Sequence, residues 1–248
     1  MRLAIISDIH EDLISLQAAL RAIEKFSCEE IICLGDISGY SVPYYDYLHS
    51  RNAHECLSLI RANCSTVILG NHDIHAASII PKHCNFFNFP DNWYQLNYHQ
   101  RHQMANNTLW LHEENDLNAL YKEDDLEYLR SLPELSVMEA NGYKILFTHY
   151  VYPNISGLKK EFYTYRDEFS QHFQYMDTFN CSISFTGHTH LRGFFAATRN
   201  KFKQYRYKRY KLKDKPICFG IPPITNQNKR NGFCIFDTDN NIIKVIKL

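Results

Sequence analysis

Three short apolar runs, each followed within two residues by a side chain that can bind a metal, constrain this chain more than any other feature. The runs cover residues 3–6, 30–34 and 66–69, and the side chains that follow them are Asp8, Asp36 and Asn71. Short, continuous apolar runs are typical of strands buried on both faces of a sheet. Leu13, Leu16 and Leu20 follow the first run at helical spacing. Strands that alternate with helices predict an α/β fold with right-handed crossovers.

The polar side chains are expected to meet at one edge of the sheet, because ligands in an open α/β sheet gather at the carboxyl ends of the strands. Two further motifs have the same placement. His149 follows a predicted hairpin with a type I′ turn at Asn141-Gly142. The Gly-His-Thr-His motif at 187–190 follows a predicted strand over residues 181–185. Placement and residue type therefore point independently to a site at these strand ends.

Seven side chains at these positions can donate oxygen or nitrogen to a metal. They are Asp8, His10, Asp36, Asn71, His149, His188 and His190. Seven donors are too many for one tetrahedral zinc ion, but they suit two ions that share a bridging carboxylate, about 3.5–4 Å apart. Carboxylate, amide and imidazole together favour Mn, Fe or Zn, and the lack of thiolate donors argues against a structural zinc site. Such a pair activates water and offsets charge on a phosphoryl group.

Composition narrows the functional classes. Lys plus Arg and Asp plus Glu each number 27, so no net charge favours binding to nucleic acid or to a membrane surface. No stretch approaches the roughly 20 apolar residues of a membrane span, and the first seven residues do not resemble a signal peptide. The eight cysteines show no close pairs of metal-type spacing and are interpreted as reduced, buried thiols. We therefore expect a cytoplasmic protein with no membrane partner.

Residues 1–248 are expected to form one domain, because no linker, repeat or low-complexity tract interrupts them. The segment 78–133 is rich in aromatic residues and His, lacks predicted strands and holds a predicted helix over 122–132, so we expect a mostly helical insertion. Another helix is predicted over 167–179. The remainder of the chain, from residue 193, is predicted to be mostly strand and to end in a hairpin around 239–241.

The motifs, in this order, resemble the calcineurin-like metallophosphoesterase superfamily. They are Asp-x-His at 8–10, Gly-Asp at 35–36, Gly-Asn-His-Asp at 70–73, Thr-His at 148–149 and Gly-His-Thr-His at 187–190. The Leu-Arg-Ser-Leu-Pro stretch at 129–133 also resembles the small bacterial branch of this superfamily. The similarity runs from residue 1 to 190. It implies a four-layer α/β/β/α sandwich of two mixed sheets flanked by helices, and phosphoesterase activity.

The resemblance also implies a role for each matching residue. Asp8, His10 and His190 would hold the first ion, Asn71, His149 and His188 the second, and Asp36 both ions. His72 would be the catalytic histidine, and an imidazole that titrates near neutral pH suits a proton donor to an alkoxide leaving group. Asp73 has two interpretations: it orients His72, or it is an exposed aspartate in a turn.

Three departures from the family pattern bear on the substrate. Glu11-Asp12 replaces the usual Gly-Asn and adds negative charge near the ions; the favoured alternative is that Asp12 caps the following helix. Residues 220–226 stand in place of the usual Asn-Pro-Gly-Ser segment. The insertion at 78–133 exceeds what a minimal member needs, so analogy does not assign the substrate.

Other residues have competing interpretations. Residues 201–211 interleave basic and aromatic side chains, as in nucleic-acid binding, but an edge strand protected by lysines is favoured. Four tyrosines either line a pocket for a base or an aromatic leaving group, or pack with bonded hydroxyls: Tyr40, Tyr44, Tyr45 and Tyr47. Tyr150, beside His149, is the stronger pocket candidate. The remaining histidines are interpreted as structural or surface residues: His49, His54, His75, His83, His99, His102, His112 and His172.

The sequence therefore predicts a phosphoesterase with two transition-metal ions that hydrolyses a phosphomonoester or phosphodiester. The expected substrate is a small phosphate ester or a nucleotide. One alternative is a catalytically inactive scaffold of the same fold, which would tolerate the loss of His72 or of a ligand. The other is a nuclease that binds its substrate through residues 201–211.

Overall fold

Two six-stranded sheets form the centre of the computed structural model, which describes residues 1–213, 215–225 and 231–248. The first sheet has the order β11-β14-β13-β1-β2-β4, with bounds Arg209–Lys211, Ile242–Lys247, Gly232–Asp237, Arg2–Ile6, Glu30–Cys33 and Thr66–Val67. The second has the order β10-β9-β12-β8-β7-β6, with bounds Lys201–Tyr205, Phe194–Thr198, Ile217–Gly220, Ile183–Thr186, Tyr143–Thr148 and Leu135–Ala140. Both sheets mix parallel and antiparallel pairs: β1 runs parallel to β2 and antiparallel to β13, and β8 runs parallel to β7.

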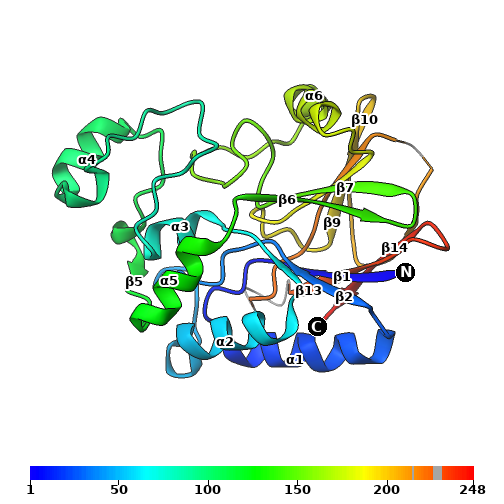
Figure 1. Cartoon of the computed structure of the whole chain (residues 1–248), viewed down its shortest axis with the longest axis horizontal. Coiled ribbons are helices and arrows are strands. Elements are labelled where there is room, and N and C mark those ends of the chain that lie inside the picture. Colours follow the sequence, from blue (N-terminus) through cyan, green and yellow to red (C-terminus); the bar gives the residue numbers. More distant parts are fainter. Residues whose placement is uncertain (214, 226–230) are drawn as a thin grey trace.

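Helices cover the outer faces of both sheets (Figure 1). The helices α1 and α2 lie along the first sheet, and α6 lies against the second. The helices span Leu13–Ile23 (α1), Ala53–Asn63 (α2), Asn71–Ala76 (α3), Tyr98–Ala105 (α4), Glu123–Ser131 (α5) and Ser170–Thr178 (α6). Short 3-10 helices span Glu24–Phe26, Leu48–Ser50, Trp93–Gln95, His112–Glu114 and Arg166–Phe169. The predicted four-layer sandwich of two mixed sheets is confirmed.

The layers follow from alternating side chains on the strands. On β1, Ala4 and Ile6 pack with the helices of the first sheet, whereas Leu3 and Ile5 pack between the two sheets. On β7, Phe147 faces the space between the sheets and Leu146 faces α6. Both faces of these strands are therefore buried, which explains why their sequences are continuous apolar runs rather than an apolar-polar alternation.

The segment 78–133 contains more than helices. Besides α4 and α5, it includes strand β5 (Asp116–Leu117), which pairs antiparallel with β3 (Tyr40–Ser41). The prediction of a strand-free insertion was wrong, because a two-residue strand is too short to carry a periodic pattern. This small ribbon attaches the insertion to the loop that follows Asp36. The predicted helix over 122–132 is confirmed as α5.

The hairpins and edge strands agree with the sequence. Asn141 and Gly142 have φ angles of 48° and 79° between β6 and β7, as a type I′ turn requires. Residues 201–211 form two edge strands in different sheets, β10 and β11. The favoured interpretation as an edge strand is thus confirmed, with one segment protecting both sheets.

All eight cysteines are free, and five of them are buried. Within the part of the chain that the structure describes, no helix has the length and apolar character needed to cross a bilayer.

Candidate metal centre

The seven predicted donors follow the carboxyl ends of five strands, β1, β2, β4, β7 and β8, six of them on loops and Asn71 at the start of α3. Six of them form two groups in which the donor atoms lie within 4.8 Å of one another. One group is Asp8, His10 and His190, and the other is Asp36, His149 and His188. The seventh, Asn71, lines the same pocket as His188 and Asp36. Side chains separated by up to 182 positions in the sequence, Asp8 and His190, therefore converge.

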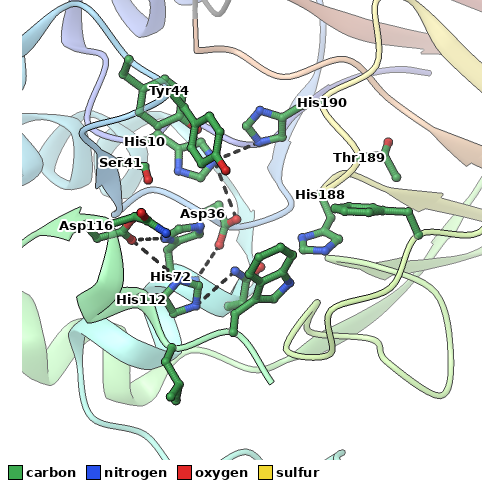
Figure 2. A pocket seen from close by; sticks show the side chains of 16 residues that line it. His10, Asp36, Ser41, Tyr44, His72, His112, Asp116, His188, Thr189 and His190 are labelled. Atoms are coloured by element: carbon green, nitrogen blue, oxygen red, sulfur yellow. Dashed lines mark hydrogen bonds and ion pairs between the residues drawn. The ribbon is translucent and has the colours of Figure 1, made fainter. Parts of the chain in front are cut away.

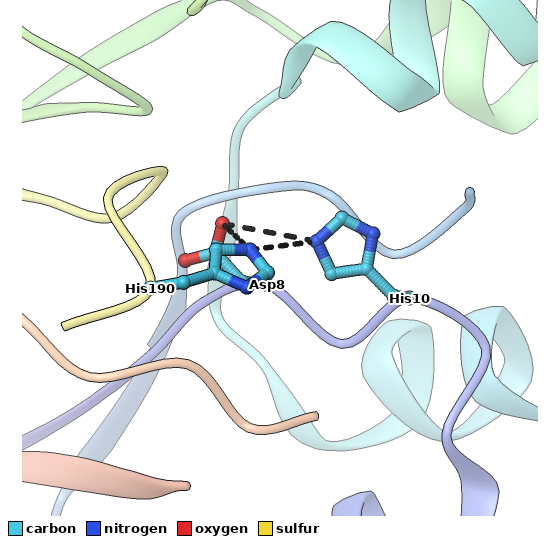
Figure 3. Close-up of side chains that lie close together, drawn as sticks. All are labelled: Asp8, His10 and His190. Carbon is cyan, nitrogen blue, oxygen red and sulfur yellow. Dashed lines mark hydrogen bonds and ion pairs between the residues drawn. The ribbon is translucent and has the colours of Figure 1, made fainter. Parts of the chain in front are cut away.

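Two imidazoles and one carboxylate face each other in the first group (Figure 3). The Nε2 atoms of His10 and His190 are 3.0 Å apart, and His190 Nε2 lies 3.3 Å from Asp8 Oδ1. Two atoms bound at right angles to one ion, about 2.1 Å from it, lie about 3.0 Å apart. The spacing of these donors therefore matches that of ligands around a single cation.

The second group contains donor atoms that are buried without a hydrogen-bond partner. Among the described residues these include Asn71 Oδ1 and His188 Nε2. His149 Nε2 lies 3.1 Å from Asp36 Oδ2, and the same oxygen lies 3.8 Å from His10 Nε2 of the first group. A buried polar atom without a partner costs free energy, so these atoms fit a bound cation. Asp36 lies between the two groups, where a bridging carboxylate belongs.

Hydrogen bonds behind the imidazoles select the nitrogen that faces the site. His10 Nδ1 lies 3.0 Å from the carbonyl oxygen of Gly39, and His149 Nδ1 lies 2.7 Å from that of Leu34. A carbonyl can only accept, so each Nδ1 carries the proton and each Nε2 presents its lone pair. An added Cβ at Gly157 would lie 2.6 Å from His188 Nδ1 and 2.8 Å from Asn71 Oδ1, so only glycine leaves room for this arrangement.

The ligand loops hold strained backbone. Five of the seven donor residues have positive φ angles: Asp8, His10, Asp36, His188 and His190. This conformation costs a residue with a Cβ about 1–2 kcal/mol. The backbone N–H groups of Ile9 and His10 both donate to the carbonyl oxygen of Asp36, at 2.7 and 2.9 Å, and so tie the first two loops together. Strain of this kind collects at functional sites, where the surrounding structure enforces it.

The charges at the centre leave it in need of a cation. Burial works to raise the pKa of the Asp36 carboxyl, but the nearby imidazoles of His149 and His72 hold this pKa well below its usual range. Burial works to lower the pKa of His149, but Asp36 outweighs it and raises this pKa to about 9. Asp36 thus stays ionised, and a proton on His149 Nε2, 3.1 Å from Asp36 Oδ2, supplies the positive charge that a metal ion bound by Nε2 would supply instead.

A model of the calcineurin-like phosphoesterase superfamily domain matches residues 1–241. The chain belongs to this superfamily. It is 29% identical to an uncharacterized protein of Methanocaldococcus jannaschii, over 99% of this chain and 86% of that protein. Among solved structures, a metallophosphoesterase from Sphaerobacter thermophilus matches with a TM-score of 0.66 and 20% identity, over 100% of this chain and 88% of the other. A hypothetical protein from Pyrococcus horikoshii matches with a TM-score of 0.60 and 14% identity, over 100% and 87%.

The family and fold assignment made from the motifs is therefore confirmed. The matching model is that of a phosphoesterase domain, and the two His/Asp groups agree with metal binding by residues of this chain. The solved structures establish the fold alone. The pocket at this metallophosphoesterase centre measures about 280 Å³.

Both interpretations of Asp73, as the residue that orients His72 and as an exposed aspartate in a turn, were wrong. Asp73 is fully buried, and its carboxylate accepts hydrogen bonds from the backbone N–H groups of Ile37, Ser38 and Gly70. It therefore joins the second and third metallophosphoesterase loops. The carboxylate that contacts His72 belongs instead to Asp116, whose Oδ2 lies 2.6 Å from His72 Nδ1 (Figure 2).

His112 also belongs to the site, although the sequence placed it among structural or surface residues. Its Nε2 lies 3.3 Å from Asn71 Nδ2, so it accepts from the amide and leaves Asn71 Oδ1 directed toward His188. Its Nδ1 lies 3.7 Å from Asp116 Oδ2, and its ring packs 4.1 Å from that of His72. The insertion thus contacts both a candidate ligand and the candidate acid. The only signal in the sequence is the His-x-x-x-Asp spacing of 112–116, which many surface segments share.

The Glu11-Asp12 departure does not add free negative charge to the centre. Asp12 accepts from the backbone N–H of Ser15 at 3.0 Å, so the favoured helix-cap interpretation is confirmed. Glu11 is buried, accepts from the N–H groups of Gly39 and Tyr40, and pairs with Arg51 at 3.5 Å. This carboxylate organises the loop after Asp36 instead of facing the ions.

The 220–226 segment, the other departure near the site, supports the first loop. The backbone N–H of Ile224 donates to the carbonyl oxygen of Ser7, and that of Thr225 donates to the carbonyl oxygen of Asp8. Asn226 lies outside the described residues. This segment stands where the family usually has Asn-Pro-Gly-Ser, and its backbone N–H groups support the loop that carries Asp8.

The tyrosines divide between the two interpretations. Tyr44 and Tyr45 line the pocket. The hydroxyl of Tyr40 donates to the carbonyl oxygen of Tyr45, and that of Tyr47 donates to the carbonyl oxygen of His10, so these two support the site from behind. The prediction that Tyr150 is the stronger pocket candidate was wrong. Its ring is fully buried in the core beneath the second sheet's helix, and its hydroxyl accepts from the N–H of Tyr163.

Proposed function

We propose that this chain is a phosphoesterase that uses two transition-metal ions, Mn, Fe or Zn, to hydrolyse a phosphomonoester or phosphodiester by attack of an activated water. The observation that carries the proposal is the pair of donor groups that share Asp36 and open into one pocket. A structural metal site would be closed and built from one set of ligands. Two adjoining sets beside an open pocket favour catalysis on a phosphate ester.

Each donor has a proposed role. Asp8, His10 and His190 hold the first ion, Asn71, His149 and His188 hold the second, and Asp36 contacts both. When bound, the ions lower the pKa of water and offset charge on the phosphoryl oxygens. The fixed Nδ1 atoms of His10 and His149 keep both Nε2 atoms available as donors.

His72 is the proposed proton donor. The carboxylate of Asp116 holds its Nδ1, so Nε2 is the nitrogen that can exchange a proton with the leaving group. His72 also lines the pocket beside Asp36 and Asn71. Water attacks the phosphorus atom, the bond to the alkoxide breaks, and the His72 proton neutralises that alkoxide. No side chain forms a covalent bond to phosphorus in this sequence of steps.

The experiment is a substrate panel with Mn²⁺ that includes mononucleotides, cyclic nucleotides, dinucleoside polyphosphates and DNA. We expect about two equivalents of metal per chain, by elemental analysis, and hydrolysis of a small ester. Two bound ions without any hydrolysis would support the inactive scaffold. Hydrolysis confined to DNA would support the nuclease, although residues 201–211 do not contribute to the described pocket.

Gly157→Ala should selectively weaken the second ion. Its Cβ would collide with His188 and Asn71, two proposed ligands of that ion, and metal affinity there should fall at least about 10–100-fold, as it does when a supporting contact is lost. Gly142→Ala is a matched control. Gly142 has a similar φ angle, 79° against 75° for Gly157, but an added Cβ would meet nothing within 4 Å.

Both alanine variants should share the backbone cost of about 1–2 kcal/mol, measured by denaturant unfolding. Only Gly157→Ala should lose metal in elemental analysis after dialysis. Equal retention of two ions by both variants would contradict the assignment of Asn71 and His188 as ligands.

A further inference from the structure

Aromatic side chains from three separate segments line the pocket beside the proposed ions. Tyr44 and Tyr45 follow β3, Trp110 belongs to the insertion, and Phe162 lies between β7 and α6. Tyr44 is 60% exposed and Phe162 is 50% exposed, although burial would stabilise both rings. Figure 2 shows Tyr44 and His112 on opposite sides of Asp36. Exposed aromatic rings at a pocket mark a surface for ligand contact.

Contacts hold several of these rings in place before any ligand binds. Phe162 stacks on His188 with ring centroids 5.2 Å apart and an angle of 26° between the ring planes. Tyr45 packs 5.3 Å from the ring of His10. The backbone N–H of Trp110 donates to the carbonyl oxygen of Leu158 at 2.9 Å, and Lys160 Nζ lies 5.5 Å from the centre of its indole ring. Rings that are already ordered lose little conformational entropy on binding a flat group.

Polar groups are interspersed with the rings. Ser41, Asn115 and Thr189 line the same pocket. The Thr189 hydroxyl and the Trp110 indole N–H are buried and have no hydrogen-bond partner within the described structure. An apolar wall with a few polar groups suits a ligand that is flat, aromatic and polar at its edges.

We propose that the substrate is a nucleotide, with its phosphate ester at the ions and its base against the aromatic wall of Tyr44, Trp110 and Phe162. This inference rests on the proposed function. The pocket volume of about 280 Å³ lies just below the roughly 300–1,000 Å³ of typical ligand sites, which suits a ligand no larger than a mononucleotide. A nucleobase combines a stacking face with polar edges, and stacking on an aromatic side chain contributes about 1–3 kcal/mol per base.

Matched substrates separate recognition of the base from the chemistry of the ester. Nucleoside 5′-monophosphates and ribose 5-phosphate share the same primary alkoxide leaving group and differ in the base. Their methyl diesters form a second matched pair if the enzyme acts only on diesters. We expect kcat/KM to favour the nucleotide by about 5- to 150-fold in whichever pair is hydrolysed. Phenylethyl phosphate tests a flat ring without polar edges, and it should fall below the nucleotide.

Variants of the wall locate the base. Trp110→Leu and Phe162→Leu should each reduce the nucleotide preference toward one. Tyr165→Leu removes an aromatic ring that is 73% exposed but outside the pocket, and it should leave the preference unchanged.

Equal kcat/KM values for the matched pair in the wild-type enzyme would overturn this inference while leaving the proposed function intact. A preference for phenylethyl phosphate equal to that for the nucleotide would also overturn it, because the polar edges would then contribute nothing. Failure to hydrolyse either nucleotide, while another ester is hydrolysed, would overturn this inference alone, whereas failure on every ester tested, with two ions bound, would overturn the proposed function itself.

Discussion

Asp36→Asn should leave the protein folded, reduce bound metal to at most about one equivalent, and lower hydrolysis by at least about 10³-fold. Asp36 Oδ2 lies 3.1 Å from His149 Nε2 in the second donor group and 3.8 Å from His10 Nε2 in the first. Removing its charge therefore affects both proposed ions, whereas loss of any other ligand affects one. The loss in kcat should therefore reach about 10³-fold, the upper end of the range for removing one preorganised electrostatic contact.

Asparagine is the appropriate replacement because it preserves the fold. Asp36 Oδ1 accepts from the backbone N–H of His72 at 2.9 Å, and the asparagine oxygen can keep this bond. Asp91→Asn, at an exposed position, makes the same chemical change away from the site. Elemental analysis, circular dichroism and kinetics on the three proteins separate metal loss from unfolding. One equivalent of metal in the wild type, unchanged in Asp36→Asn, would refute the dinuclear centre.

His72→Ala should keep both ions and lower kcat by about 10²–10⁴-fold on an alkyl phosphate ester. An alkoxide needs a proton when it leaves, and general acid catalysis supplies it in the transition state. A nitrophenolate leaving group needs little protonation, so the loss on a nitrophenyl ester should be much smaller. The ratio of the two losses is the decisive measurement, because a general structural defect would lower both rates alike.

Asp116→Asn should show the same dependence on the leaving group with a smaller amplitude, because Asp116 acts through His72 Nδ1. His75→Ala provides the control: His75 lies on the same helix and packs 5.2 Å from His112, but it is absent from the pocket lining. Its rates on both esters should stay near those of the wild type. Wild-type turnover of both esters by a His72→Ala protein with two ions would show that His72 is not the acid.

The insertion lines the pocket beside the proposed metal centre. Trp110, His112 and Asp116 all come from it, and the ribbon of β3 and β5 fixes it to the loop after Asp36. Loops that are positioned by a rigid scaffold commonly carry specificity. Substrate choice should therefore differ among superfamily members that share the metal ligands but differ in this segment.

The sequence alone determined the candidate metal ligands and the strands that present them. Each ligand motif directly follows a run of buried residues, as Asp8 follows β1 and Asp36 follows β2, so local order along the chain carried the information. The turn at Asn141-Gly142 and the Asp12 cap were predictable for the same reason, because each depends on a few neighbouring residues.

Only the tertiary structure decided which side chains support those ligands and form the pocket wall. Asp116 meets His72 across 44 positions, and Phe162 meets His188 across a segment that includes α6 and β8, without any repeating pattern to mark either contact. The adjacent Asp73 was the natural candidate to orient His72, yet its carboxylate is used by three backbone N–H groups. Secondary-structure periodicity and capping are local, whereas contacts between irregular loops depend on how distant segments pack. For that physical reason the ligands could be predicted from the chain, but the groups that position them and the wall that meets the substrate could not.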